Sequence, residues 1–245
     1  MSGESLDVMD RSPALQIFKK KGLEVLLLDD HLDESCLQKL ADYEGKKFVS
    51  VQKSDVKIEE SEAEKKRFSK LKDMYKPLTD WLKDELTAVT EKGALKSTGL
   101  KIESVVLSKR LVDSPCVVVT SQFGYSAHQE KIMRAQAFQN KDQLNMMSGR
   151  KTFEINPNHP VIIDLLKKVK ADPHSTSTKE SALVLFQTAV LDSGYDIADP
   201  AALVSRIYRL MSKDLGVDPD AAVHEVEVPE DEETTPETSE EDGEL

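Results

Sequence analysis

Two consecutive helical segments near the end of the chain constrain its fold most. The first, residues 179–193, is apolar on nearly every side between Ala182 and Leu191, so we expect it to be buried on more than one face. The second, residues 200–215, follows an Asp-Pro start signal and has a broad apolar face. Periodicity leaves two arrangements open: the helices cover the sheet that precedes them, or they pair with their copies in a second subunit.

The charge distribution separates a body from an acidic tail. No Lys or Arg follows Lys213, and residues 224–245 hold 11 of the 45 acidic residues, so residues 1–223 carry 33 basic against 34 acidic groups. Self-repulsion and the scarcity of apolar side chains predict disorder for residues 221–245. The negative tail disfavours nucleic-acid binding. No apolar run reaches the roughly 18 residues of a membrane-spanning helix, so we expect no membrane insertion.

Residues 1–57 are expected to form a small α/β unit. Ser12-Pro13 and Gly22 bracket a short helix, because a capping hydroxyl, a proline at the first helical position and a closing glycine are helix boundary signals. Residues 23–28 have the apolar pattern of a buried strand. A second helix is predicted over 33–40, and a second strand over 47–51.

Residues 58–220 alternate longer helices with strands. Ser61 and Glu64 have the spacing of a capping box, which starts a helix, and Pro77 should kink it. Valine-rich runs predict strands over 102–107 and 116–120. Further helices are expected over 127–137 and 160–169. The fold class predicted is α+β: an α/β unit over 1–57, a mixed helix and sheet domain over 58–220 that ends in the two apolar helices, and the tail over 221–245.

Catalytic and metal-binding patterns are weak. The ten glycines occur singly and form no phosphate-binding loop, and the five histidines lack the spacing of a zinc site. Cys36 and Cys116 are both expected to be small buried thiols. An enzyme using Cys116 with His128 is a weak alternative, because a thiol in an apolar strand has a raised pKa and is inert. We therefore predict no catalytic residue, metal or cofactor in this chain.

A different functional signal comes from apolar side chains in a polar segment. Leu144, Met146 and Met147 lie between residues 139 and 151, where Asn and Gly interrupt the pattern. Flexible methionines suit promiscuous apolar contacts. Phe123 and Tyr125 form a second candidate patch. These five residues are the candidate client-contact residues, although each group could instead pack within the subunit.

An ordered set of motifs resembles the ninety-kilodalton heat-shock chaperone family. The set is KKKGLEVL at 19–26, RLVDSPC at 110–116, KIMRAQA at 131–137 and FEINPNHP at 153–160, with Phe-Gly-Tyr at 123–125 and Ser-Gly-Tyr at 193–195. The resemblance covers roughly residues 2–220. It implies that the chain corresponds to the last α/β part of the family's middle domain followed by the carboxy-terminal dimerisation domain.

The resemblance resolves the choice between the two arrangements of the apolar helices in favour of a homodimeric four-helix bundle. The candidate dimer residues are Leu183, Leu185, Phe186, Ala189, Val190, Tyr195, Leu203, Ile207, Leu210 and Met211. The family binds ATP and Mg in an amino-terminal domain that this chain lacks, so the segment should not hydrolyse ATP. It should hold unfolded or partly folded client proteins. The alternative is a purely structural dimerisation module without a client surface.

The last residues suggest a branch of the family. Cytosolic members end in Met-Glu-Glu-Val-Asp, whereas this chain ends in Asp242, Gly243, Glu244 and Leu245, which resembles a degenerate endoplasmic-reticulum retrieval signal read by a receptor. Ser-Leu-Asp at 5–7 and Phe-Glu-Ile at 153–155 are also more similar to the endoplasmin branch. We therefore expect the endoplasmic-reticulum lumen as the location, with the cytoplasm as the alternative.

Overall fold

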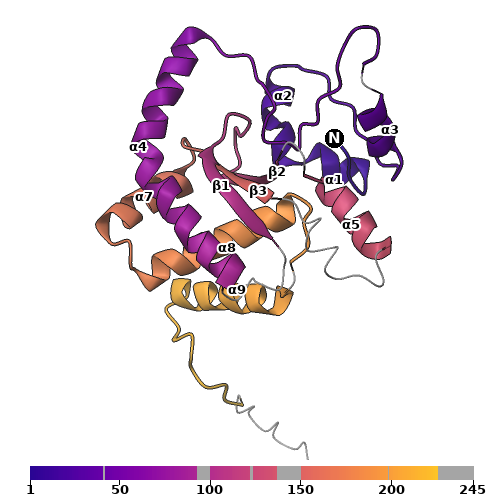
Figure 1. The fold of residues 1–245 in the computed structure, drawn as a ribbon. Coiled ribbons are helices and arrows are strands. Elements are labelled where there is room, and N and C mark those ends of the chain that lie inside the picture. The colour runs from indigo at the N-terminus through magenta and orange to yellow at the C-terminus, as the bar shows by residue number, and fades with distance from the viewer. Residues whose placement is uncertain (41, 93–99, 122–123, 137–149, 198, 226–245) are drawn as a thin grey trace, which may run out of the picture.

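A three-stranded mixed sheet forms the centre of the protein (Figure 1). The computed structural model describes residues 1–245 except 41, 93–99, 122–123, 137–149, 198 and 226–245. Strands β1 (Lys101–Leu107), β2 (Cys116–Thr120) and β3 (Arg150–Ile155) take the order β1-β3-β2. The middle strand, β3, runs parallel to β1 and antiparallel to β2. The fold is α+β.

The sequence predicted the two outer strands and missed the middle one. Residues 102–107 and 116–120 match β1 and β2 closely, because their valine-rich pattern is the ordinary signal of a buried strand. In β3, by contrast, Lys151 and Glu154 are both buried. Charged residues are seldom buried unless they are paired. A prediction based on hydrophobicity alone therefore does not recognise this segment as a central strand.

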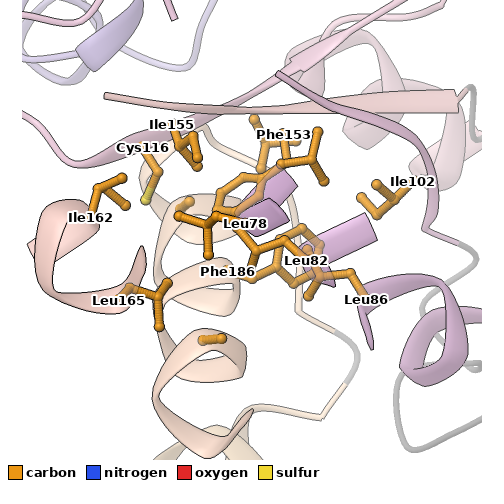
Figure 2. Packing of buried hydrophobic residues seen from close by; sticks show 14 of the residues in the cluster. Leu78, Leu82, Leu86, Ile102, Cys116, Phe153, Ile155, Ile162, Leu165 and Phe186 are labelled. Carbon is orange, nitrogen blue, oxygen red and sulfur yellow. The ribbon is translucent and has the colours of Figure 1, made fainter. Parts of the chain in front are cut away.

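Three helices enclose the main core: α4 (Glu62–Thr87), α7 (Pro160–Ala171) and α8 (Thr176–Asp192). Two of them, α4 and α8, pack against the sheet, and α7 packs against both of these helices. Figure 2 shows Phe153 of β3 pointing toward Leu82 and Phe186, which come from α4 and α8. The rings of Phe153 and Phe186 meet edge to face, with centroids 5.4 Å apart. Aromatic pairs prefer this arrangement to face-to-face stacking.

Helix α4 begins where its capping box predicts. The Ser61 hydroxyl accepts a hydrogen bond from the Glu64 backbone N–H at 3.2 Å, and the Glu64 carboxylate accepts one from the Ser61 N–H at 2.7 Å. The predicted apolar stripe faces the core through Tyr75, Leu78 and other residues one turn apart. The helix runs without interruption through Pro77 and ends in a π-helical turn, η2 (Ala88–Lys92).

Two further predicted helices complete this part of the chain. Helix α5 (Ala127–Gln136) follows β2, and helix α9 (Pro200–Asp214) follows α8. The turn between α8 and α9 contains Gly194 with a φ of 84°, a conformation that glycine adopts readily and other residues avoid. Among the described residues no helix is both long and apolar enough to cross a membrane.

The first part of the chain is helical and differs from the predicted α/β unit. It contains α1 (Leu6–Asp10), which was not predicted, η1 (Pro13–Leu15), α2 (Gln16–Lys20) and α3 (Asp33–Lys39), the last three close to the predicted helices. A small apolar cluster of its own is built on Leu15, Phe18 and Val51.

The two strands predicted here, over 23–28 and 47–51, do not form. A strand needs a continuous row of hydrogen bonds to a neighbour, whereas residues 23–28 meet the chain start at scattered points, the isolated bridge between Ser2 and Leu28 and a bond from the Met1 amino group to the Leu26 carbonyl. Leu23 and Leu26 are accordingly about half exposed, at 52% and 50%. Apolar composition alone therefore misidentified both segments as buried strands.

Buried polar contacts join this first part to the sheet. The Arg110 guanidinium is 3% exposed, pairs with Glu154 at 3.0 Å, and donates to the backbone carbonyls of Val51 and Lys53. At a second point, the Ser126 hydroxyl donates to the Glu34 carboxylate at 2.6 Å. Separating the two parts would take two carbonyl acceptors from the Arg110 guanidinium and the Ser126 hydroxyl from the Glu34 carboxylate, which is costly for buried charged groups.

Candidate dimerisation and client-contact sites

Helix α9 has one side that packs on α8. Leu203 is buried against the rest of the subunit. Further along the same side, Arg206 donates a 3.2 Å hydrogen bond to the Gln187 side-chain oxygen, and Lys213 pairs with Glu180 at 2.9 Å. Both partners belong to α8, so polar contacts and apolar burial together fix how α9 lies along α8 (Figure 1).

The opposite side of α9 is apolar and exposed. Its residues recur at intervals of three and four, which places them on one helix face; we call Val204, Ile207, Tyr208, Met211 and Leu215 the α9 apolar face. Tyr208, Met211 and Leu215 are 63%, 53% and 72% exposed. Contiguous exposed apolar surface of this kind marks interaction sites on soluble proteins.

The ten candidate dimer residues fall into three groups in the structure. Phe186, Ala189, Val190, Tyr195 and Leu203 are buried within the subunit. Leu183, Leu185 and Leu210 are half-buried, and Ile207 and Met211 are exposed on the α9 apolar face. Only the last two groups have side-chain surface that a second subunit could contact in this conformation.

The apolar pattern of α9 could not separate these groups. Leu203 and Leu210 lie on the side that packs on α8. Their apolar neighbours in the sequence, Val204 and Tyr208, lie on the exposed side. The candidate list omitted Val204, Tyr208 and Leu215, although they widen the same apolar pattern. Both sides of the helix carry apolar residues, so the sequence alone does not say which one α8 covers.

The candidate client-contact residues are mostly outside the described part of the chain. Phe123, Leu144, Met146 and Met147 lie there, and so do the four candidate retrieval residues, Asp242 to Leu245. Tyr125 is described: its side chain is half-buried, and its backbone carbonyl lies 3.5 Å from the Lys151 ammonium.

That ammonium belongs to a buried charge cluster which the sequence did not predict. The Lys151 side chain is 1% exposed and pairs with the Glu130 carboxylate of α5. Its Nζ also lies 4.3 Å from the centre of the Tyr195 ring, which comes from the turn between α8 and α9. Burial lowers the pKa of Lys151 and raises the pKa of Glu130, and the opposite charge of each partner counteracts both shifts.

A more exposed group of charges surrounds the same turn. The Asp196 carboxylate lies 3.6 Å from the Arg134 guanidinium and 3.8 Å from the Lys131 ammonium, and both bases are on α5. Lys131 also pairs with Glu4 at 2.7 Å, near the start of α1. Helix α5 is thus held by charge to the α8–α9 turn on one side and to the first part of the chain on the other.

The two cysteines differ, which corrects the expectation that both are buried. Cys116 is buried, and burial raises the pKa of its thiol to about 12. Cys36 is exposed on α3. Helix α3 lies at the edge of the small first part of the chain, where few residues are available to cover it (Figure 1).

A hollow of about 280 Å³ lies between α7 and the start of α8. Most of its lining residues have polar side chains, and two of their hydroxyls bond within the helices: that of Ser175 accepts from the Thr178 N–H, and that of Ser181 donates to the Ser177 carbonyl. The basic group in its lining, Lys168, pairs with Asp164 at 3.0 Å.

Comparisons with known proteins agree with the motifs. The family model "Hsp90 protein" matches residues 1–243. The endoplasmin homologue of Arabidopsis thaliana is 38% identical over 236 residues, which is 96% of this chain and 27% of the relative. The endoplasmin homologue of Hordeum vulgare is 40% identical over 227 residues, 93% of this chain and 26% of the relative. The chain thus spans about a quarter of the length of these relatives. It belongs to the Hsp90 family, in the endoplasmin branch.

Proposed function

We propose that this chain is the dimerisation and client-binding segment of an ATP-dependent protein-folding chaperone. The observation that carries the proposal is the α9 apolar face, a row of exposed apolar side chains on a helix whose other side is already packed. In a two-fold dimer the same face from each subunit would meet its copy. Helices α8 and α9 of both subunits would then form a four-helix bundle.

The homodimer would join two chaperone chains and keep their client-binding surfaces close together. Membership of the Hsp90 family supports the chaperone role. ATP and Mg would bind in an amino-terminal domain of the full-length protein, as the resemblance implies. This chain would therefore not hydrolyse ATP by itself, and its part would be to couple the two protomers while the upstream domain turns over nucleotide.

The client surface is proposed at Leu144, Met146 and Met147, together with Phe123 and Tyr125. The test replaces Leu144, Met146 and Met147 with serine and measures how well the chain suppresses aggregation of a heat-unfolded reporter protein, by light scattering. Val161, a half-exposed apolar residue on α7, supplies the control variant Val161→Ser. We expect the triple variant to lose suppression and the control to keep it. Unchanged suppression by the triple variant would instead support a purely structural dimerisation module.

We also propose that the protein resides in the lumen of the endoplasmic reticulum. Its relatives are named endoplasmin homologues, and Asp242 to Leu245 would be read by a retrieval receptor. A secreted reporter ending in these four residues should be retained in cells. The same reporter with the four residues in scrambled order is the control, and equal secretion of both would refute retrieval by this signal.

A further inference from the structure

Lys151 is placed between the two surfaces of the proposed function. Its ammonium contacts three groups from two regions of the chain: the Tyr125 carbonyl and the Glu130 carboxylate, just before and on α5, and the Tyr195 ring after α8. Lys151 itself is on β3, the middle strand of the sheet. Tyr125 is a candidate client-contact residue, and Tyr195 lies in the turn that leads into α9. One buried cation therefore touches both regions.

These contacts are directional, and burial makes them hard to exchange. An ammonium has three N–H donors and no acceptor, and here one meets a carboxylate, another faces a carbonyl, and the charge lies over an aromatic ring. With 1% of the Lys151 side chain and 9% of the Glu130 side chain exposed, water cannot replace a lost partner. A movement of α5 therefore separates the pair unless β3 moves with it, and a displaced ammonium also changes its contact with the Tyr195 ring.

We infer that Lys151 and Glu130 are positioning residues that couple the client-contact surface to the dimer. The inference rests on the proposed function, since it needs both surfaces to exist. A client that shifts Tyr125 or α5 disturbs the ammonium and, through it, Tyr195 at the entry to α9. The outer charges of Arg134 and Lys131 on Asp196 connect the same two elements, but they are partly exposed and so are screened by water.

The coupling is measurable as a change in dimer affinity when a client binds. The dimer dissociation constant of the full 245-residue chain is measured by sedimentation velocity, alone and with saturating reduced, carboxymethylated α-lactalbumin, an unfolded model client. Thermodynamic coupling between two sites typically amounts to a factor of about 5 to 150. We expect the client to change the dimer dissociation constant of the wild-type chain by at least about five-fold, either up or down.

The decisive variant is the double substitution Glu130→Leu with Lys151→Met. It removes both charges and keeps similar volumes, whereas a single substitution leaves a buried charge unpaired and can unfold the protein. The matched control is Lys76→Met with Asp80→Leu, which removes an exposed pair at 2.7 Å on α4. Circular dichroism and a thermal melt confirm that both variants are folded.

The expected result is that the control keeps the wild-type shift and that the Glu130/Lys151 variant loses it, while still forming dimers and binding the client. An equal shift in the Glu130/Lys151 variant would overturn the inference. So would a wild-type chain that dimerises and binds the client without any shift. If the wild-type chain neither dimerises nor binds the client, the proposed function itself fails, which is a separate and recognisable result.

Discussion

Replacing Tyr208 and Met211 together with serine should weaken the proposed dimer severely. These side chains are 63% and 53% exposed in the subunit, so roughly half of each remains to be buried by a partner. Full burial of a large apolar side chain contributes about 2 kcal/mol, so each residue has about 1 kcal/mol to gain. A two-fold interface uses both residues twice, which gives a loss of about 4 kcal/mol, or roughly a thousand-fold in the dissociation constant.

Sedimentation velocity over a dilution series measures this directly. The substitutions lie on the exposed side of α9, so the folded subunit should be unaffected, and its thermal melt at a concentration where both proteins are monomeric is the check. Met74→Ser, which removes an apolar side chain on α4 that is 48% exposed, is the control and should leave the dimer intact. If the double variant dimerises as tightly as the wild-type chain, the α9 apolar face is not the interface.

Three further predictions concern single residues. A thiol reagent should modify Cys36 in the native protein and Cys116 only after unfolding, because burial raises the pKa of Cys116 to about 12; two fast native thiols would contradict this. Phe186→Ala should lower the free energy of unfolding by about 4 kcal/mol, since Phe186 is fully buried, and chemical denaturation with Phe186→Leu as the milder comparison tests it. Ser61→Ala should cost about 1 kcal/mol at neutral pH. The Ser61 backbone N–H and hydroxyl both donate to the Glu64 carboxylate and lower its pKa. The substitution removes only the hydroxyl bond, so the part of the stability difference that this bond contributes should be lost as the pH falls through the Glu64 pKa, as stability measured against pH would show.

Features of the fold that depend on residues close in sequence were predicted correctly, whereas several features that depend on distant residues were not. Helices α7, α8 and α9 were predicted close to their observed bounds and α4 at its observed start, because caps and apolar periodicity act within a few residues. The strands predicted over 23–28 and 47–51 were wrong, and β3 was missed. A strand depends on its neighbours in the sheet, which are distant in sequence.

The candidate site shows the same division. Apolar periodicity predicted a helix with a broad apolar face over 200–215 but could not assign its sides, since both carry apolar residues. The packing of Arg206 on Gln187 decides which side is covered. No local pattern indicated that Lys151 and Glu130, 21 residues apart, form a buried pair beneath Tyr195.

The sequence by itself determined the family, the order and bounds of the main helices, and the separation of a nearly neutral body from an acidic tail. All of these depend on residue identity and on patterns a few residues long. The tertiary structure alone decided which apolar side of α9 stays exposed, which cysteine is buried, and where the charges of β3 find their partners. Burial and pairing depend on which distant segments meet, and that is a property of the folded chain rather than of any stretch within it.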